Sequence, residues 1–361
     1  MTSWNTELLE AVAAMAERVG IDATTPAAVA DGPLWAALTE AGFTEIGIPE
    51  EQRGSGGTAS DALSVVHAVT AQGAHTMLIE HTALASRLVA ECTGSPAPGP
   101  ATLATADDGC TTRDTADGTV LDGTVTGVVH GSDADVLVVL LPASAAGERP
   151  TVAVVAADAP GISVERGSDL LGAALDDFHF EATPARLHES PVDATELEER
   201  GALAYAVALT AAAGAVRDRT LRYATERVQF GRPLAKFQAI QQRLAGLAAL
   251  TALMETATEA ATTADDATRR TAIAAAKVVT SASAREVAAA GHQIHGAIGF
   301  TSEHSLGRFT TALWSWRDRY GSERYWSEVL AGQILDEGAD PWDLITGACI
   351  TEHVAAEGIA R

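Results

Sequence analysis

The middle of the chain follows a different pattern from its two ends. From about residue 97 to residue 195, short runs of β-branched residues alternate with Asp-Gly, Gly-Ser and Pro turn signals. Runs bounded in this way predict the strands of an antiparallel sheet or a small barrel. On either side, apolar residues recur at spacings of three and four residues, which predicts helices. The sequence therefore predicts an α+β protein with a β-domain between two helical domains.

The change of pattern also gives expected domain boundaries. We expect an N-terminal helical domain over 1–96, a middle β-domain over 97–195, and a C-terminal four-helix bundle with a tail over 196–361. The alanine-rich faces of the C-terminal segments allow the close helix approach that a bundle needs. The tail from Gly338 has weak signals and is expected to be loosely held.

Individual elements can be expected at stated positions within these domains. In the middle domain, the Asp-Gly pair of LDGTV (121–125) predicts a hairpin turn, because glycine adopts the positive φ angle that such turns need. The expected N-terminal helices lie near 8–19, 33–43 and 60–91, and the bundle helices near 201–229, 236–266, 268–297 and 323–338.

Charge and composition exclude several classes of function. The 361 residues carry a formal net charge of −24, and an even field of that sign repels nucleic acid and anionic membranes. No apolar run approaches the roughly 20 residues that span a bilayer, and the N-terminus lacks a basic leader, so we expect a cytoplasmic protein. The chain has ten histidines but no HExxH motif, so we expect no metal site. Three widely spaced cysteines fit a reducing compartment: Cys92, Cys110 and Cys349.

Two blocks near the C-terminus combine helix-end signals with polar residues. The first is ERVQFGRPLAKFQAIQQRLA (226–245), in which Arg227 ends a helix and Gly231 and Pro233 redirect the chain. The second is GHQIHGAIGFTSEH (291–304), in which glycines after a helix let the backbone approach a ligand closely. Taken singly, each block can also be explained as an ordinary helix end, where cations and glycines are common.

In this order, the two blocks resemble the C-terminal domain of the acyl-CoA dehydrogenase family. The turn IGIPEEQRGSGG (46–57) and the strands ADVLVVLLP (134–142) and LDDFHFEATPA (175–185) agree with the same family, so the resemblance covers about residues 5–336. It implies the family's fold, FAD as cofactor and acyl-CoA as substrate. It also implies that one group of residues contacts FAD bound mainly by a neighbouring subunit: Arg227, Phe230, Gln238, Gln293, Ile294, His295, Gly296 and Ala297.

The resemblance fails at the family's catalytic base. Most members have a Glu directly before a Gly-Thr or Gly-Ser pair, but here Tyr320 holds that position before Gly321 and Ser322. A phenol with a pKa near 10 is a poor base for a thioester α-proton. The alternative base position of the family falls in 204–212, which contains no acid. Glu323 is the weaker alternative, because it also fits the start of a helix. We therefore expect no catalytic residue in this chain.

The flavin-binding motif of the middle domain is missing as well. The corresponding stretch, ATLATADDGCTTRDTAD (101–117), lacks the family's Pro-x-Ala-Gly-Ser run and is expected to be a solvated loop. The aromatic residues around the lost base are expected to fill a vacated pocket and to brace a subunit contact. They are Trp314, Trp316, Tyr320 and Trp326.

Together, the retained and missing motifs resemble the subunit without a catalytic Glu in actinobacterial heterotetrameric (α2β2) acyl-CoA dehydrogenases. The resemblance implies a homologous partner that carries the Glu and binds most of the acyl-CoA, which is of a bulky kind such as a steroid side chain. It also implies an electron acceptor such as electron-transfer flavoprotein. Two alternatives stay open: a flavin-dependent monooxygenase or oxidase on the same fold, and a non-catalytic structural homologue.

Overall fold

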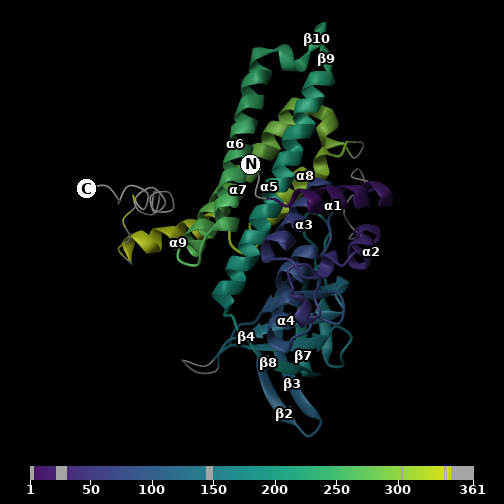
Figure 1. Cartoon of the computed structure of the whole chain (residues 1–361), viewed down its shortest axis with the longest axis vertical. Helices are drawn as coiled ribbons and strands as arrows, with labels where there is room; N and C mark the ends of the chain where they lie inside the picture. Colours follow the sequence, from purple (N-terminus) through teal and green to yellow (C-terminus); the bar gives the residue numbers. More distant parts are fainter. Residues whose placement is uncertain are drawn as a thin grey trace, which may run out of the picture.

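The computed structural model describes residues 4–21, 31–143, 149–301 and 304–336, together with positions 338, 340 and 342. Most of the predicted loose tail, with Cys349, lies outside the described residues. The molecule is elongated, with N-terminal helices at its centre, two sheets at one end and a helical hairpin at the other (Figure 1). The structure combines helices with sheets and has a C-terminal helical domain, which confirms the predicted α+β fold class. The domain boundaries at 96/97 and 195/196 stay a prediction.

Two N-terminal elements, α3 and η3, pack against the longest bundle helix, α5 (Ala194–Glu226). The continuous helix expected over 60–91 is wrong, because the chain turns at Gly73. This residue has a φ of +77°, and a Cβ there would lie 2.7 Å from the ring of Phe309, so only glycine fits. The elements are α1 (Thr6–Val19), α2 (Gly32–Glu40), η1 (Phe43–Glu45), η2 (Glu50–Gln52), α3 (Ala59–Ala71), the π-helix η3 (Ile79–Ala85) and α4 (Ser86–Thr93).

The middle of the chain forms two four-stranded sheets, with orders β1-β4-β5-β8 and β2-β3-β7-β6. An apolar core that includes Leu121, Val139 and Phe180 joins them. The pairing is antiparallel as predicted, except that β1 and β4 are parallel. The elements are β1 (Ala101–Thr105), β2 (Thr111–Thr115), β3 (Gly118–Val129), η4 (Gly131–Asp133), β4 (Val136–Leu141), β5 (Thr151–Ala156), β6 (Ile162–Glu165), β7 (Leu175–Pro184) and β8 (Arg186–Glu189).

Two local predictions in this region are wrong. The stretch 101–117 is not one solvated loop, because it contains β1 and β2. Every residue of β2 is exposed, so no apolar alternation marks it, and backbone pairing with β3 holds it. The hairpin turn lies at Ala116 and Asp117 rather than at 121–125, which is inside β3. Gly123 instead forms a bulge, where a Cβ would lie 2.6 Å from the Gly109 carbonyl oxygen.

Up to residue 336, the described part of the C-terminal region contains the four predicted helices and one more. The additional helix, α8, has only 11 residues and buries Leu306, Phe309 and Leu313 against the bundle. Its shortness and its buried polar residues, Arg308 and Thr310, explain why the sequence did not reveal it. The remaining elements are α5, β9 (Val228–Gln229), β10 (Arg232–Pro233), η5 (Leu234–Lys236), α6 (Gln238–Thr263), α7 (Arg269–His295), η6 (Gly296–Phe300), α8 (Leu306–Trp316) and α9 (Glu323–Leu335).

Candidate functional site

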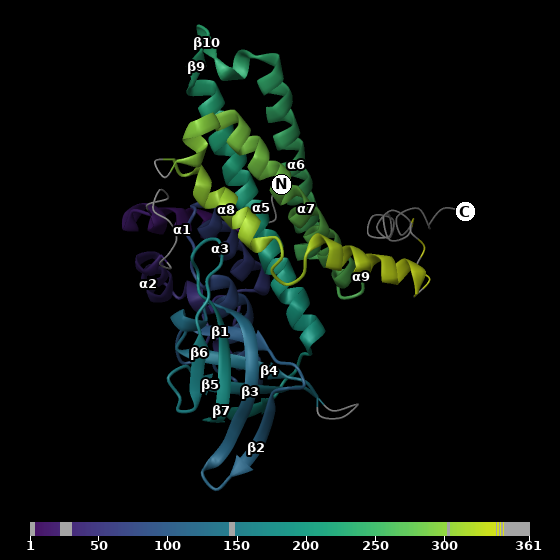
Figure 2. The same cartoon turned by 180° about the vertical axis from the view of Figure 1, so that it is seen from behind.

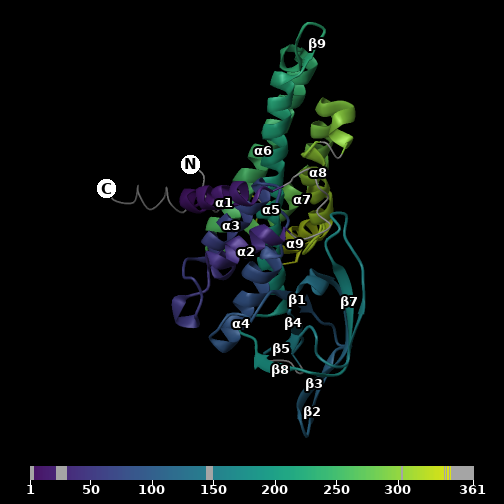
Figure 3. The same cartoon turned by 90° about the vertical axis from the view of Figure 1, so that its right-hand side faces the viewer.

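The first group of predicted cofactor residues lies at the tip of the α5–α6 hairpin. Arg227 follows the last residue of α5, as predicted, and its carbonyl accepts a hydrogen bond from the Leu234 backbone N–H at 2.9 Å. Phe230 sits in the tight turn with a φ of +50°, and its side chain is 91% exposed. Gln238 is the first residue of α6. Figures 2 and 3 show this tip projecting beyond the rest of the chain, so its side chains are available to another molecule.

The second group lies where α7 ends. Gln293, Gly296 and Ala297 line a cavity of about 480 Å³, together with Phe300 and Trp314. Gly296 ends the helix with a φ of +63°, and no atom lies within 4 Å of the position that a Cβ would take. A ligand can therefore reach the backbone here. Ile294 and His295 are 4% and 3% exposed, so they contribute packing and backbone rather than side chains to this cavity.

The two groups lie at the same end of the bundle. Tyr223, one turn before Arg227 on α5, stacks on His295 of α7 with ring centroids 4.4 Å apart. The Nδ1 of His295 donates to the Gly291 carbonyl at 2.8 Å, which leaves Nε2 as a buried acceptor without a described partner. Burial lowers the pKa of His295. An exposed Arg and an open glycine backbone fit a phosphate-bearing ligand such as FAD.

The Tyr320-Gly321-Ser322 turn, the expected base position, is closely packed. Tyr320 has a φ of +50° and lies directly on α5, where a Cβ at Gly201 would be 2.3 Å from its ring. Its ring also stacks on Tyr205, with centroids 5.9 Å apart. The indole N–H of Trp326 donates to the Tyr320 carbonyl at 2.8 Å. The turn therefore places an aromatic side chain against α5 and holds it there through Trp326.

The cavity beside this turn is nearly filled. It measures about 20 Å³ and is lined by residues of all three regions, including Glu80, His130, Tyr205 and Trp316. A volume of that size holds about one water molecule. The Tyr205 hydroxyl donates to the Glu80 carboxylate. Burial, and then the Glu80 charge, raise the pKa of both Tyr205 and Tyr320. These phenols stay protonated and cannot act as bases.

The filled cavity and the hairpin tip are far apart on the same helix. Tyr205 and Arg227 are 22 positions apart along α5, which corresponds to about 33 Å at 1.5 Å per residue. Figure 1 shows the tip, with β9 and β10, at the end of the molecule opposite the sheets. The tip residues therefore do not line the chain's own cavity.

Glu323, the alternative base, is the first residue of α9, as its position after Ser322 predicted. Its carboxylate pairs with the Arg317 guanidinium. The Arg317 carbonyl in turn accepts hydrogen bonds from Lys277 Nζ at 2.7 Å and from Ser281 Oγ at 2.7 Å. Glu323 thus has a structural partner, and it belongs to a network that holds the turn in place.

Lys277 makes the stability of the fold depend on pH. Its side chain is fully buried in α7, and burial lowers its pKa from the ordinary 10.5 to about 7. Between those values the unfolded chain holds a proton that the folded chain has released. Stability therefore rises with pH across this window, by an amount on the order of a few kcal/mol.

We expect Lys277→Met to remove this rise. The free energy of unfolding, measured in denaturant between pH 7 and pH 10, should increase more for the parent than for the variant. Lys236, the chain's only other lysine, is exposed, so Lys236→Met is the control and should retain the rise. Parallel pH profiles for the parent and Lys277→Met would contradict the expectation.

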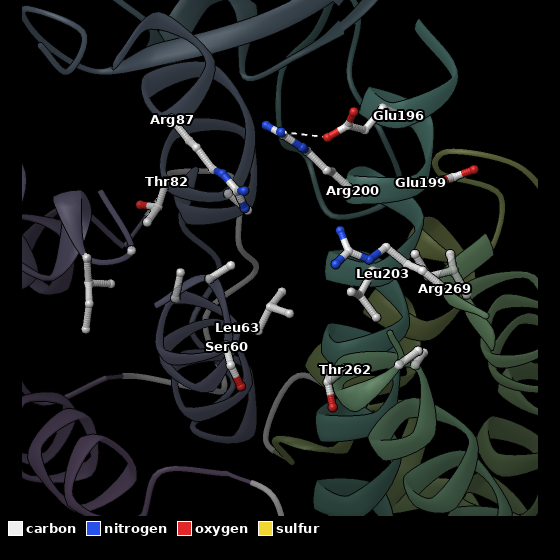
Figure 4. Close-up of a pocket in the computed structure, with 18 residues that line it drawn as sticks. Ser60, Leu63, Thr82, Arg87, Glu196, Glu199, Arg200, Leu203, Thr262 and Arg269 are labelled. Atoms are coloured by element: carbon white, nitrogen blue, oxygen red, sulfur yellow. Dashed lines mark hydrogen bonds and ion pairs between the residues drawn. The ribbon is translucent and has the colours of Figure 1, made fainter. Parts of the chain in front are cut away.

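A separate cavity of about 210 Å³ lies between the N-terminal helices and the bundle. Figure 4 shows Arg87, Arg200 and Arg269 around it, contributed by α4, α5 and α7. Arg200 pairs with Glu91 at 2.9 Å and with Glu196 at 2.8 Å, and Arg87 also pairs with Glu91. The sequence did not predict this cluster, because its members come from distant segments. Its charges largely compensate one another, which fits ion pairs that join two layers of helices.

No group of His, Cys, Asp and Glu side chains suited to a metal ion occurs among the described residues. Within the same residues, no helix is both long enough and apolar enough to cross a membrane.

Comparisons with known proteins agree with the architecture. Residues 194–340 match the family model described as acyl-CoA dehydrogenase, C-terminal domain. A curated relative, acyl-CoA dehydrogenase IpdE2 of Mycobacterium tuberculosis, is 42% identical over 91 residues. This match covers 24% of the chain and about a quarter (26%) of the relative's length.

Two solved structures share the fold over nearly the whole chain. The ChsE4-ChsE5 complex of Mycobacterium tuberculosis superposes with a TM-score of 0.81 at 22% identity, covering 92% of this chain and 98% of that one. A variant of the Tcur3481-Tcur3483 steroid ACAD gives a TM-score of 0.78 at 24% identity, covering 93% and 99%. The C-terminal region of the chain thus matches the C-terminal domain of acyl-CoA dehydrogenases, and the whole chain shares the fold of these two solved structures.

Proposed function

We propose that this chain is the subunit of an FAD-dependent acyl-CoA dehydrogenase that completes a cofactor site in a homologous partner. One observation carries the proposal. The cavity lined by Tyr205, on which Tyr320 stacks, measures about 20 Å³, whereas pockets for cofactors and drug-sized ligands measure hundreds of Å³. The residues that fit a cofactor are instead exposed at the far end of α5.

The chain's own residues would hold the cofactor from one side. Arg227 offers a planar guanidinium to the diphosphate oxygens, and Gly296 lets the backbone approach the same group. The exposed ring of Phe230 is placed to pack on the adenine, and Gln238 and Gln293 supply amide hydrogen bonds. When bound, FAD accepts the hydride that leaves the β-carbon of the acyl group.

The missing base would come from the partner. Neither Tyr320, whose pKa is raised, nor Glu323, which pairs with Arg317, is available to remove an α-proton. A homologous subunit with a Glu at the corresponding position would supply it. The α2β2 arrangement draws support from two structural neighbours whose names join two different chains, ChsE4-ChsE5 and Tcur3481-Tcur3483. The steroid ACAD among them favours a bulky acyl-CoA substrate. We infer an electron acceptor such as electron-transfer flavoprotein from the resemblance to the family alone.

Co-expression of the chain with a homologue that carries the Glu and is encoded by a neighbouring gene tests this function. We expect the purified complex to dehydrogenate a steroid side-chain acyl-CoA with a dye acceptor, and the chain alone to be inactive. Replacing the partner's Glu by Gln should abolish turnover without dissociating the complex. Dehydrogenation by the isolated chain, or consumption of oxygen by its own bound flavin, would overturn the proposal and favour an autonomous flavoenzyme.

A further inference from the structure

The cavity of about 210 Å³ between the N-terminal helices and the bundle has no part in the proposed function. It lies on the opposite side of α5 from the filled cavity. Leu203 lines it, whereas Gly201 and Tyr205 face Tyr320. Two residues along a helix correspond to a rotation of about 200° around its axis. The two cavities are therefore separate.

A cavity of this size suits a small organic molecule. It is far larger than the space that one water molecule needs, and it lies below the range of about 300–1,000 Å³ that takes drug-sized ligands. Its apolar wall includes Leu63 of α3, Leu203 of α5 and Ile273 of α7. These side chains offer a surface on which a short hydrocarbon body can be removed from water.

Two guanidinium groups, those of Arg87 and Arg269, point into the cavity from opposite sides (Figure 4). Arg87 donates to Glu91 only through its Nε, at 2.9 Å, and its two terminal nitrogens donate no hydrogen bond to a described residue. Burial, and then the charge of Arg200, lower the pKa of Arg87, so Glu91 compensates its charge only in part. Arg269 pairs with Asp266 at 2.8 Å, but 94% of the Asp266 side chain is exposed, so water screens this pair.

The two acids that line the cavity do not compete for these donors. Glu196 pairs with Arg200 at 2.8 Å, and Glu199 pairs with Arg270 at 3.2 Å. Figure 4 shows the Glu199 carboxylate pointing away from the cavity. An anion that enters the cavity therefore meets hydrogen-bond donors rather than carboxylates.

We propose that this cavity binds a small monocarboxylate, with the carboxylate between Arg87 and Arg269 and the hydrocarbon body against the apolar wall. A planar guanidinium matches the geometry of a carboxylate, and hydrogen bonds between such charged groups are among the strong ones. Arg87 belongs to α4 and Arg269 to α7, so the ligand joins the N-terminal helices to the bundle and stabilises the folded chain. The inference depends neither on FAD nor on the partner subunit.

The test measures the binding of hexanoate to the full chain by isothermal titration calorimetry. We expect saturable binding of hexanoate and no binding of hexanamide, which has the same length but no charge. Arg87→Gln and Arg269→Gln should each weaken hexanoate binding by about tenfold or more, because each removes charge-assisted hydrogen bonds. The control Arg18→Gln removes an exposed arginine of α1, outside the cavity, and should leave the binding unchanged.

A variant that fills the cavity tests the site without changing a charge. Ser60 of α3 lines the cavity, and Ser60→Phe places a ring in it, which should abolish hexanoate binding. The unfolding midpoint of each variant without ligand shows whether it is folded, since Arg87→Gln also loses the bond to Glu91. Absence of hexanoate binding, equal binding of hexanamide, or unchanged binding in the folded variants would overturn the site. Inorganic phosphate that binds as tightly as hexanoate would assign the arginines to an inorganic anion and also overturn it.

Discussion

Replacing Arg227 by alanine should remove most of the FAD from the complex with the partner subunit. The guanidinium is the fixed cation at the end of α5 that would meet the cofactor diphosphate. Truncating one partner of a charged interface pair costs about 2–5 kcal/mol, which weakens FAD binding at least about thirtyfold. The change is measured as the ratio of FAD to protein after gel filtration, and as the Kd for FAD by flavin fluorescence.

Arg222→Ala is the matched control for this loss. Arg222 is an exposed arginine on the same helix, five residues before Arg227. Its removal should leave the FAD content of the complex unchanged. If Arg227→Ala retains the parent's FAD content, the cofactor role of the hairpin tip is wrong, and a structural role for this helix end remains.

Replacing Trp326 by alanine should cause the largest loss of stability among the aromatic residues of the former base segment. The side chain is 1% exposed and packs in a cluster with Ala202, Ala206 and Ile273, while its indole N–H holds the Tyr320 carbonyl. Large-to-small substitutions of buried Trp cost about 3–5 kcal/mol. The measurement is the midpoint and slope of urea unfolding for the free chain.

Trp314→Ala provides the comparison, because this side chain is 42% exposed and lies beside the cavity at Gly296. We expect it to cost less than about 1 kcal/mol in the free chain. A loss for Trp326→Ala as small as that for Trp314→Ala would show that the aromatic residues do not fill and brace the space around the base position.

The parts of the site that were predictable are those encoded by neighbouring residues. The end of α5 at Arg227, the glycine cap at Gly296 and the start of α9 after Ser322 all follow from short local signals. The four longest bundle helices were predictable for the same reason, because each repeats a 3.6-residue pattern over many turns.

The parts that were not predictable depend on contacts between distant segments. The filling of the cavity requires Tyr320 to lie on Gly201 and Tyr205 to reach Glu80, which are 119 and 125 positions away in the chain. Strand β2 carries no apolar alternation, and it exists because β3 supplies its hydrogen bonds.

The number of flavins in the assembled protein tests the central claim most directly. Absorbance of the purified complex, with protein determined by amino-acid analysis, gives the FAD count per heterodimer, and the same measurement applies to the chain alone. We predict about one FAD per heterodimer and none in the isolated chain, because the cavity of about 20 Å³ beside Tyr205 cannot admit a second flavin ring. Two FAD per heterodimer, or a stably bound FAD in the isolated chain, would contradict this prediction.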